Sequence, residues 1–185
     1  MGLRIIGGMY KGKQLSALKG YSVRPTSALV RESIFNILSE HVLGTTVLDL
    51  FAGTGALGIE ALSRGAHHAV FIDFNPKAIG AIGQNLKRCG AEGISKIIRW
   101  DLRKNLKCIF SYTPKFDLIF IDPPYNIGAV ESSLNHLETV QSINDEAIVV
   151  IEHGLKEPIP DHGRFRIADQ RKYGKTLVSF LNYVV

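Results

Sequence analysis

Short apolar runs alternate with amphipathic segments along the middle of this chain. The runs have the length of buried strands, and they lie at residues 47–51, 69–72, 94–100, 116–121 and 147–151. Apolar residues repeat at helical spacing over residues 28–40, over about 56–64, and from Asn75-Pro76 to near Gly90. Because strands alternate with helices, we expect an α/β fold in which a doubly wound, mostly parallel sheet is covered on both faces.

Both ends of the chain depart from this alternation. Residues 164–172 and 176–184 predict two strands joined by a Gly-X hairpin turn at Gly174. An antiparallel C-terminal pair should therefore close the parallel sheet. At the other end, residues 4–15 predict a short hairpin that is interrupted by glycines.

The size and composition of the chain suit one globular domain with a small appendage. It has 185 residues, of which 45% are hydrophobic. We expect a basic N-terminal extension of hairpin plus helix over residues 1–45 and a main domain over residues 46–185. No apolar run reaches the ~18 residues of a membrane span, and no signal-peptide pattern is present. Two cysteines, Cys89 and Cys108, are too few for a disulfide scaffold or a cysteine-rich metal site, so we expect a cytoplasmic, metal-free monomer.

Charge is distributed unevenly along the chain. The net charge is +5, but residues 47–152 hold ten Lys or Arg and twelve acids. Residues 1–46 hold six basic and two acidic residues, and residues 153–185 hold six and three. An acidic centre between basic ends fits a cationic ligand in the middle and a polyanion such as nucleic acid outside. A solvated basic surface explains the two ends equally well.

A glycine-rich loop follows the first strand of the main domain. Gly53, Gly55 and Gly58 satisfy the G-x-G-x-x-G spacing that lets a ligand lie against bare backbone, as in dinucleotide sites. Asp49 stands beside this loop, and a carboxylate there disfavours a pyrophosphate. A ligand that carries an ammonium and a sulfonium group fits better. The loop therefore favours S-adenosylmethionine over a nicotinamide or flavin dinucleotide.

Acidic residues also end the next two strands. Asp73 is placed to accept both hydroxyls of a ribose, and Asp101 can accept a hydrogen bond from an adenine amino group. The carboxyl ends of parallel strands share one edge of the sheet, where open α/β sheets bind ligands. The alternative is that Asp49 and Asp73 only cap the turns that follow them. The expected cofactor residues are Asp49, Phe51, Ala52, Gly53, Thr54, Gly55, Asp73, Asp101 and Leu102.

Asp122-Pro123-Pro124-Tyr125 ends the fourth strand at that same edge. An exocyclic amine on a base is a poor nucleophile, because its lone pair is delocalised into the ring. The Asp122 carboxylate and the Pro123 carbonyl can each accept one N–H of such an amine, and the two prolines stiffen the loop. Tyr125 offers a face on which the base can stack. We expect Asp122, Pro123 and Tyr125 to be catalytic; the alternative is a proline-stiffened turn with ordinary packing.

Together these motifs resemble the class I, Rossmann-like methyltransferases that act on base amino groups. The closer resemblance is to the bacterial small-subunit ribosomal RNA guanine-N2 methyltransferases, the RsmD family. It rests on Arg24-Pro25-Thr26, residues 30–32, 35–38, 48–58 and 60–66, and the glycine after Tyr173. The resemblance covers nearly the whole chain. It implies a seven-stranded mixed sheet, S-adenosylmethionine as cofactor, and N2 of a guanine in 16S ribosomal RNA, guanine 966, as the target.

The chain departs from that family at one place. Ala28 and Leu29 stand where members usually carry an Asp-Arg pair. The replacement removes a charge pair near the expected substrate mouth and leaves the expected chemistry unchanged.

Ribosomal RNA, or the small ribosomal subunit that contains it, is the expected partner. Arg24 and Arg31 lie about one helical turn apart, where they could hold phosphates, and Arg171 and Lys172 lie beside the last hairpin. Exposed surface charge is the alternative interpretation for each of them. The expected RNA contacts are Arg24, Thr26, Arg31, Pro124, Tyr125, Arg171 and Lys172.

Three alternative functions stay open at this point. A DNA adenine-N6 methyltransferase would use the same tetrapeptide, although the chain leaves little room for a target-recognition domain. An RNA-binding protein with a vestigial cofactor site is disfavoured by the intact Asp49, Asp73 and Asp122. A dinucleotide oxidoreductase is disfavoured by Asp49.

Overall fold

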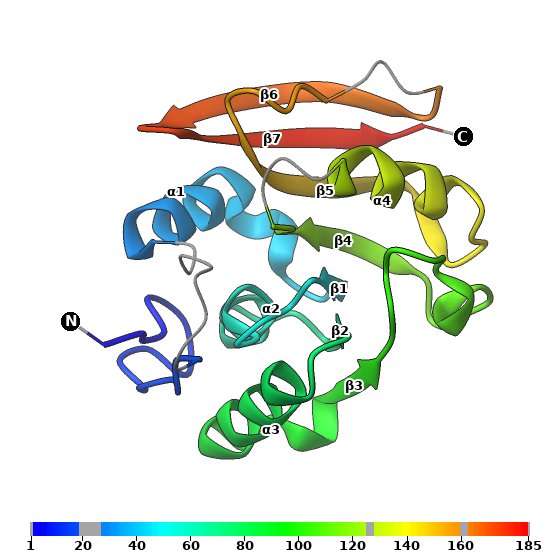
Figure 1. Cartoon of the computed structure of the whole chain (residues 1–185). Coiled ribbons are helices and arrows are strands. Elements are labelled where there is room, and N and C mark those ends of the chain that lie inside the picture. Colours follow the sequence, from blue (N-terminus) through cyan, green and yellow to red (C-terminus); the bar gives the residue numbers. More distant parts are fainter. Residues whose placement is uncertain (1, 19–26, 125–127, 160–162, 185) are drawn as a thin grey trace.

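One mixed sheet forms the centre of the molecule. The computed structural model describes residues 2–18, 27–124, 128–159 and 163–184. Their strands are β1 Thr46–Leu50, β2 His68–Asp73, β3 Ser95–Arg99, β4 Phe116–Ile121, β5 Ile143–Gly154, β6 Phe165–Tyr173 and β7 Thr176–Tyr183. They lie in the order β3-β2-β1-β4-β5-β7-β6 (Figure 1). Neighbours among β1 to β5 are parallel, and β7 is antiparallel to both β5 and β6.

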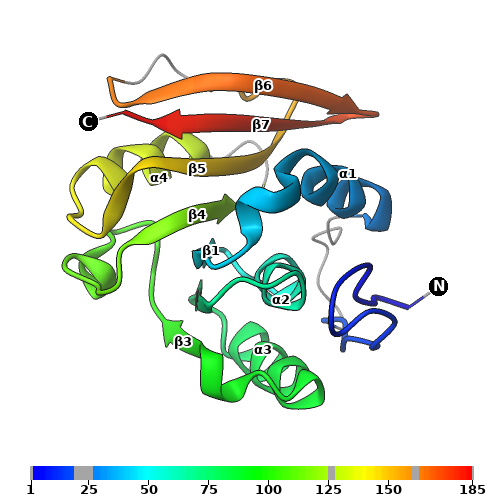
Figure 2. The same ribbon diagram turned by 180° about the vertical axis from the view of Figure 1, so that it is seen from behind.

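Helices cover both faces of this sheet. The α-helices of the described residues are α1 Ala28–Leu38, α2 Ala56–Ser63, α3 Pro76–Cys89 and α4 Ala129–Glu138. Helices α1, α2 and α3 lie on one face and α4 on the other (Figures 1 and 2). Alternating strand residues serve the two faces: Val47 packs in the cluster beneath α1 to α3, and Leu48 in the cluster beneath α4. The expected doubly wound α/β architecture is confirmed.

The five apolar runs predicted β1 to β5, and the C-terminal hairpin pattern predicted β6 and β7. Strand β4 has the predicted bounds, whereas β5 begins earlier than expected, at Ile143. Helix α1 ends at Leu38, and a short 3-10 helix, Ser39–Val42, continues from it. Helix α4 was not predicted, although its apolar residues do lie at helical spacing. Those buried residues are Ala129, Val130, Leu134 and Leu137.

Local capping signals explain where the helices begin and end. The Ser27 hydroxyl accepts a hydrogen bond from the amide of Val30 at 3.2 Å, which starts α1. Asn75 caps α3 in the same way, with Pro76 as the first helical residue. Gly90, with φ of +72°, ends that helix in the left-handed conformation. In the described part of the chain, no helix is both long and apolar enough to cross a bilayer.

The N-terminal extension packs directly against the main domain. Its expected hairpin is reduced to a single antiparallel bridge between Arg4 and Gln14. The carboxylate of Glu60, which is buried in α2, accepts hydrogen bonds from the amides of Ile6 and Gly7, each at 2.8 Å. Apolar residues of the extension belong to the same buried cluster as α1 to α3. The described residues on either side of position 45 thus share one core, and the boundary proposed there stays a prediction.

Candidate active site

The carboxyl ends of neighbouring strands bring four acidic residues to one edge of the sheet. Leu50 in β1 pairs with Ile72 in β2 and with Ile121 in β4, so these three strands end level with one another. The acids at this edge are Asp49, Asp73, Asp101 and Asp122. The structure therefore assembles the edge that the sequence predicted as the ligand site.

The glycine loop between β1 and α2 is a tight turn. The amide of Ala52 donates to the carbonyl of Ile72 at 3.1 Å, and the amide of Gly55 donates to the carbonyl of Ala52 at 2.7 Å. Gly53 and Gly55 have φ of +55° and +76°, in the left-handed region that glycine adopts without strain. Phe51 has φ of +58° without being glycine, and strained conformations of this kind gather where ligands bind.

The third glycine of the motif serves close packing. A Cβ atom on Gly58 would lie 2.4 Å from Cε1 of Phe71 and 3.1 Å from Oδ2 of Asp49. A side chain here would push α2 away from β2, so only glycine lets the helix approach the sheet at this point. Its amide donates to Oδ2 of Asp49 at 2.9 Å.

Asp49 is a buried carboxylate that lacks a cation among its described partners. Its residue is 1% exposed, and burial raises the pKa of Asp49 well above its ordinary value. The hydrogen bond from Gly58 opposes this shift, while the charges of Asp122 and Asp73 add to it. The three carboxylates thus interact electrostatically, and a positively charged ligand group beside them would be stabilised.

Asp73 holds the two turns that flank it. One carboxylate oxygen accepts a hydrogen bond from the amide of Gly53 at 3.0 Å, and the other accepts one from the amide of Asn75 at 2.9 Å. Asp73 therefore does cap the adjacent turns, as the alternative interpretation predicted. It does not exclude ribose binding, because each carboxylate oxygen has a second lone pair.

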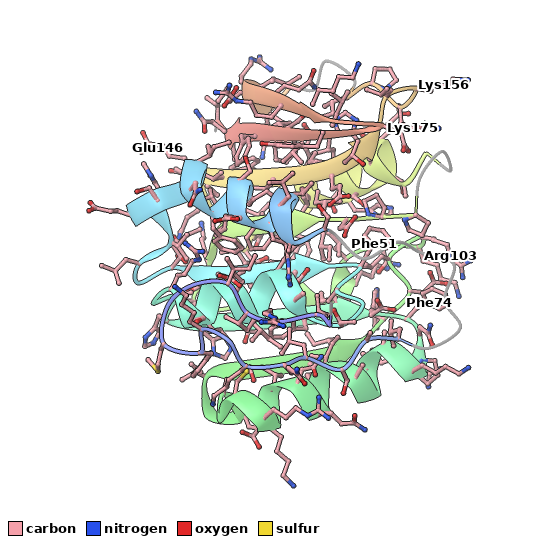
Figure 3. All side chains as sticks on the ribbon, turned by 90° about the vertical axis from the view of Figure 1, so that its left-hand side faces the viewer. Phe51, Phe74, Arg103, Glu146, Lys156 and Lys175 are labelled. Atoms are coloured by element: carbon pink, nitrogen blue, oxygen red, sulfur yellow. The ribbon has the colours of Figure 1, made fainter. Side chains whose placement is uncertain are left out.

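Asp101 is paired with a cation that the sequence did not single out. Arg103 donates to its two carboxylate oxygens through Nε at 2.8 Å and Nη2 at 2.9 Å. These hydrogen bonds lower the pKa of Asp101 to about 2. The guanidinium carbon of Arg103 also lies 5.2 Å from the centre of the Phe74 ring. Figure 3 shows Phe51, Phe74 and Arg103 on one side of the molecule, opposite Glu146.

The remaining expected cofactor residues divide into backbone and packing positions. Thr54 is half-buried, and its carbonyl accepts a hydrogen bond from Asn85. Ala52 and Leu102 are 9% and 5% exposed, and Leu102 packs in the cluster beneath α4. Leu102 can therefore reach a ligand only with the edge of its side chain.

Asn85 is a second residue that the sequence analysis missed. It is fully buried in α3, its Oδ1 accepts from the amide of Ser16 at 2.7 Å, and its Nδ2 donates to the carbonyls of Ser16 and Thr54. Asn85 thereby joins the N-terminal extension to the middle of the glycine loop. A polar residue on the inward stripe of an amphipathic helix was the available signal.

The first three residues of the tetrapeptide, Asp122 to Pro124, lie where the fourth strand was expected to place them. Asp122 is half-buried, Pro123 is buried and Pro124 is exposed. Leu50, which follows Asp49, pairs with Ile121, which precedes Asp122, so the two acidic residues lie at neighbouring strand ends. Tyr125 lies outside the described residues, so its expected stacking role stays a prediction.

The residues expected to contact RNA lie in different environments, and some of them lie outside the described part of the chain. Arg24 and Thr26 lie outside the described residues. The phosphate-binding role of Arg31 is contradicted, because Arg31 is 1% exposed and its Nη2 donates to the carbonyl of Arg4 at 3.0 Å. Position 31 falls on the inward face of α1, where burial lowers the pKa of this guanidinium and the charge of Glu60 partly restores it.

Arg171 and Lys172 remain accessible. Both lie on the exposed stretch of β6, where Nε of Arg171 is paired with Asp169 at 2.9 Å. Lys172 pairs with Leu177 of β7, close to the turn that lies beside the carboxyl end of β5. Lys156 and Lys175 project on the same side of the molecule as Phe51 and Arg103 (Figure 3). Basic side chains thus border the candidate site.

The described residues contain no group of three or more His, Cys, Asp or Glu side chains arranged to hold a metal ion. Cys89 and Cys108 are both free thiols, of which Cys89 is buried. The groups that this edge of the sheet offers to a ligand are carboxylates, backbone amides and carbonyls, and aromatic faces.

Known proteins resemble this chain along almost its whole length. The family model described as Conserved hypothetical protein 95 matches residues 3–182. YlbH of Bacillus subtilis is 36% identical over 96% of this chain and 97% of its own length. Ribosomal RNA small subunit methyltransferase D of Escherichia coli (strain K12) is 34% identical over 85% of this chain and 78% of its own length. The solved structure of yhhF from Escherichia coli has a TM-score of 0.85 and 28% identity, and 98% of each chain is covered.

These matches include the N-terminal extension as well as the sheet and its helices. The mostly parallel seven-stranded sheet with an antiparallel C-terminal pair is the fold of the class I methyltransferases, as the sequence predicted. The chain belongs to the Conserved hypothetical protein 95 family, the family of the ribosomal RNA small subunit methyltransferase D proteins.

Proposed function

We propose that this protein transfers a methyl group from S-adenosylmethionine to the exocyclic N2 of a guanine in small-subunit ribosomal RNA, guanine 966 by family resemblance. Family membership supports ribosomal RNA as the substrate class. One structural observation carries the chemistry: Leu50 of β1 pairs with Ile121 of β4, so Asp122 follows β4 at the strand end beside the one that carries Asp49. An amine acceptor and a site for a cationic methyl donor are therefore adjacent.

The residues at the strand ends fit the cofactor. Its ammonium and sulfonium charges match the buried Asp49 and its acidic neighbours, whose mutual repulsion a cation would relieve. The glycine loop offers backbone at Gly53 and Gly55, where a larger side chain would interfere. In this proposal Asp73, whose carboxylate oxygens retain lone pairs, holds the ribose, and Asp101 accepts a hydrogen bond from the adenine amino group. The bound cofactor supplies an electrophilic methyl group on its sulfonium.

The acceptors of Asp122 and Pro123 prepare the base. The Asp122 carboxylate accepts one N–H of the guanine amine and the Pro123 carbonyl accepts the other, which fixes the nitrogen and turns its lone pair outward. The Asp122 carboxylate, which is hydrogen-bonded to the amine, would accept the proton that the nitrogen gives up on methylation. The catalytic contribution is mainly positioning, since the protein holds both reactants in line. A base within a duplex must swing out of its stack to reach these groups.

Basic side chains around this edge serve the RNA. Arg171 and Lys172 on β6 lie near the turn that borders the site. Contacts with phosphates position an RNA without reading its sequence. These residues therefore set affinity, and the loop that carries Asp122 and Pro123 selects the amine.

Transfer of labelled methyl groups tests the proposal. The protein is incubated with labelled S-adenosylmethionine and small ribosomal subunits from a strain that lacks its own enzyme of this family. The modified nucleosides are then separated and identified. We expect N2-methylguanosine at guanine 966 and no label in duplex DNA. Label on adenine, or no incorporation into the subunits or their RNA, would contradict the proposed function.

A further inference from the structure

Arg103 fills a position at the cofactor edge of the sheet. Its guanidinium is held by both oxygens of Asp101, at 2.8 and 2.9 Å, and lies over the ring of Phe74. Phe74 directly follows Asp73 at the end of β2, and its side chain is 50% exposed. Figure 3 shows both side chains on the same side of the molecule as Phe51. Two strand ends thus present a carboxylate and an aromatic face to the same group.

The guanidinium group of Arg103 shares two properties with adenine. A guanidinium is planar and presents a pair of N–H donors along one edge. Adenine is also planar, and its exocyclic amine donates along one edge. A carboxylate beside an exposed aromatic face suits both groups, because the carboxylate accepts the donors while the ring takes the flat surface.

We propose that Arg103 is an affinity-determining residue that competes with the adenine base of the cofactor for Asp101 and Phe74. The inference rests on the proposed function, in which Asp101 binds the adenine amino group. Cofactor binding then requires the Arg103 side chain to leave both partners. The residue sets how tightly the cofactor is held and takes no part in methyl transfer.

The strength of this competition is modest. The Arg103 side chain is 66% exposed and that of Asp101 is 24% exposed, so water screens the ion pair. Removing a competitor of this strength should improve binding by roughly threefold. The displaced guanidinium is also free to bind an RNA phosphate, which couples cofactor binding to the substrate side of the same edge.

Isothermal titration calorimetry of the full chain with S-adenosylmethionine and with adenosine tests the inference. Adenosine carries the base but no charge, so it reports competition for the base position without a Coulomb effect. The test variant is Arg103→Ala. The control is Lys104→Ala, which removes an equal charge from an exposed neighbour whose side chain acts on Asp101 through its charge. We expect Arg103→Ala to lower Kd about threefold for both ligands, and Lys104→Ala to leave adenosine binding unchanged.

Each other outcome has a defined meaning. Weaker or unchanged binding by Arg103→Ala would overturn the inference, since Arg103 would then cover the bound base or stay clear of it. Equal tightening by Lys104→Ala would also overturn it, because charge alone would explain the gain. Asp101→Ala should weaken adenosine binding and cancel the benefit of Arg103→Ala in the double variant. A parent chain that binds neither ligand would instead overturn the proposed function, and the inference with it.

Discussion

The carboxylate of Asp49 accepts a hydrogen bond from the amide of Gly58 at 2.9 Å, which ties the first strand to the helix that follows the glycine loop. Glycine favours this contact, since a Cβ atom at position 58 would lie 3.1 Å from the same carboxylate oxygen and 2.4 Å from the ring of Phe71. A buried acid and a bare backbone position thus depend on each other. We propose that the pair contributes both to the stability of this corner and to its affinity for a cationic ligand.

Replacing Asp49 with asparagine should stabilise the ligand-free protein at neutral pH and impair cofactor binding. The folded state raises the pKa of Asp49 and so holds a proton that the unfolded chain releases near pH ~4. The stabilising contribution of Asp49 is therefore greatest below that pH and declines as pH rises toward the raised value. Asp49→Asn keeps an oxygen for the Gly58 amide but does not titrate.

Thermal melts of Asp49→Asn and the parent between pH 4 and 8 measure this effect. The melting temperature of the variant, measured relative to that of the parent, should increase as pH rises. Its affinity for S-adenosylmethionine should fall by about tenfold or more, because the cationic ligand loses its carboxylate. Parallel melting curves together with unchanged affinity would show that Asp49 is neither strained nor a cofactor ligand.

Gly58→Ala should destabilise the fold by about 2 kcal/mol, through overpacking between α2 and β2. The added methyl would lie 2.4 Å from the ring of Phe71, which is fully buried and cannot move aside cheaply. Gly80→Ala is the matched control, since Gly80 lies in the exposed face of α3 and its Cβ would meet nothing within 4 Å. In the Gly80→Ala control, the higher helix propensity of alanine should raise the free energy of unfolding by up to ~1 kcal/mol. Urea denaturation of both variants decides the matter, and equal stabilities would refute the packing role.

Asn85→Ala should loosen the N-terminal extension from the glycine loop. The change removes all three hydrogen bonds of Asn85 and leaves the Ser16 amide and the Thr54 carbonyl without this partner. We expect a loss of about 2 kcal/mol in unfolding free energy and faster hydrogen exchange at the Ser16 amide. Gln84→Ala, on the exposed face of the same helix, serves as the control. Identical exchange in the two variants would show that Asn85 does not hold the extension.

Lys172→Ala should weaken RNA binding without a change in cofactor affinity. Removing one phosphate contact lowers the slope of log affinity against log salt by about one. Lys115→Ala provides the control, because Lys115 is exposed just before β4, at the opposite edge of the sheet. Filter binding of small-subunit RNA across a salt series gives both slopes. Equal salt slopes for the two variants would show that Lys172 makes no phosphate contact.

The strands and their acids were predictable because they depend on local pattern and on one rule of topology. Buried parallel strands appear as apolar runs, and their carboxyl ends must meet, so the sequence alone was enough to group Asp49, Asp73 and Asp122. Helix α4 could also have been found, since Val130, Leu134 and Leu137 lie at helical spacing.

The residues that sequence reasoning misjudged depend on partners far away in the chain. Arg31 is buried because α1 turns it toward the carbonyl of Arg4 and the charge of Glu60. Asn85 gains its role from Ser16, 69 residues earlier. Helical spacing places Asn85 on the inward stripe of α3, but it does not identify the partner of Asn85 or those of Arg31, which resembles an ordinary surface arginine in the sequence. Tertiary contacts therefore decide which partners an inward polar residue meets.

The most direct measurement compares Asp122→Ala with the parent for two properties of the same preparation: affinity for S-adenosylmethionine and the single-turnover rate of methyl transfer to small subunits. Because Asp122 is proposed to hold the amine and not the cofactor, the affinity should change by less than about threefold, while the transfer rate should fall by at least about a hundredfold. An unchanged transfer rate in a protein that still binds the cofactor would contradict the account.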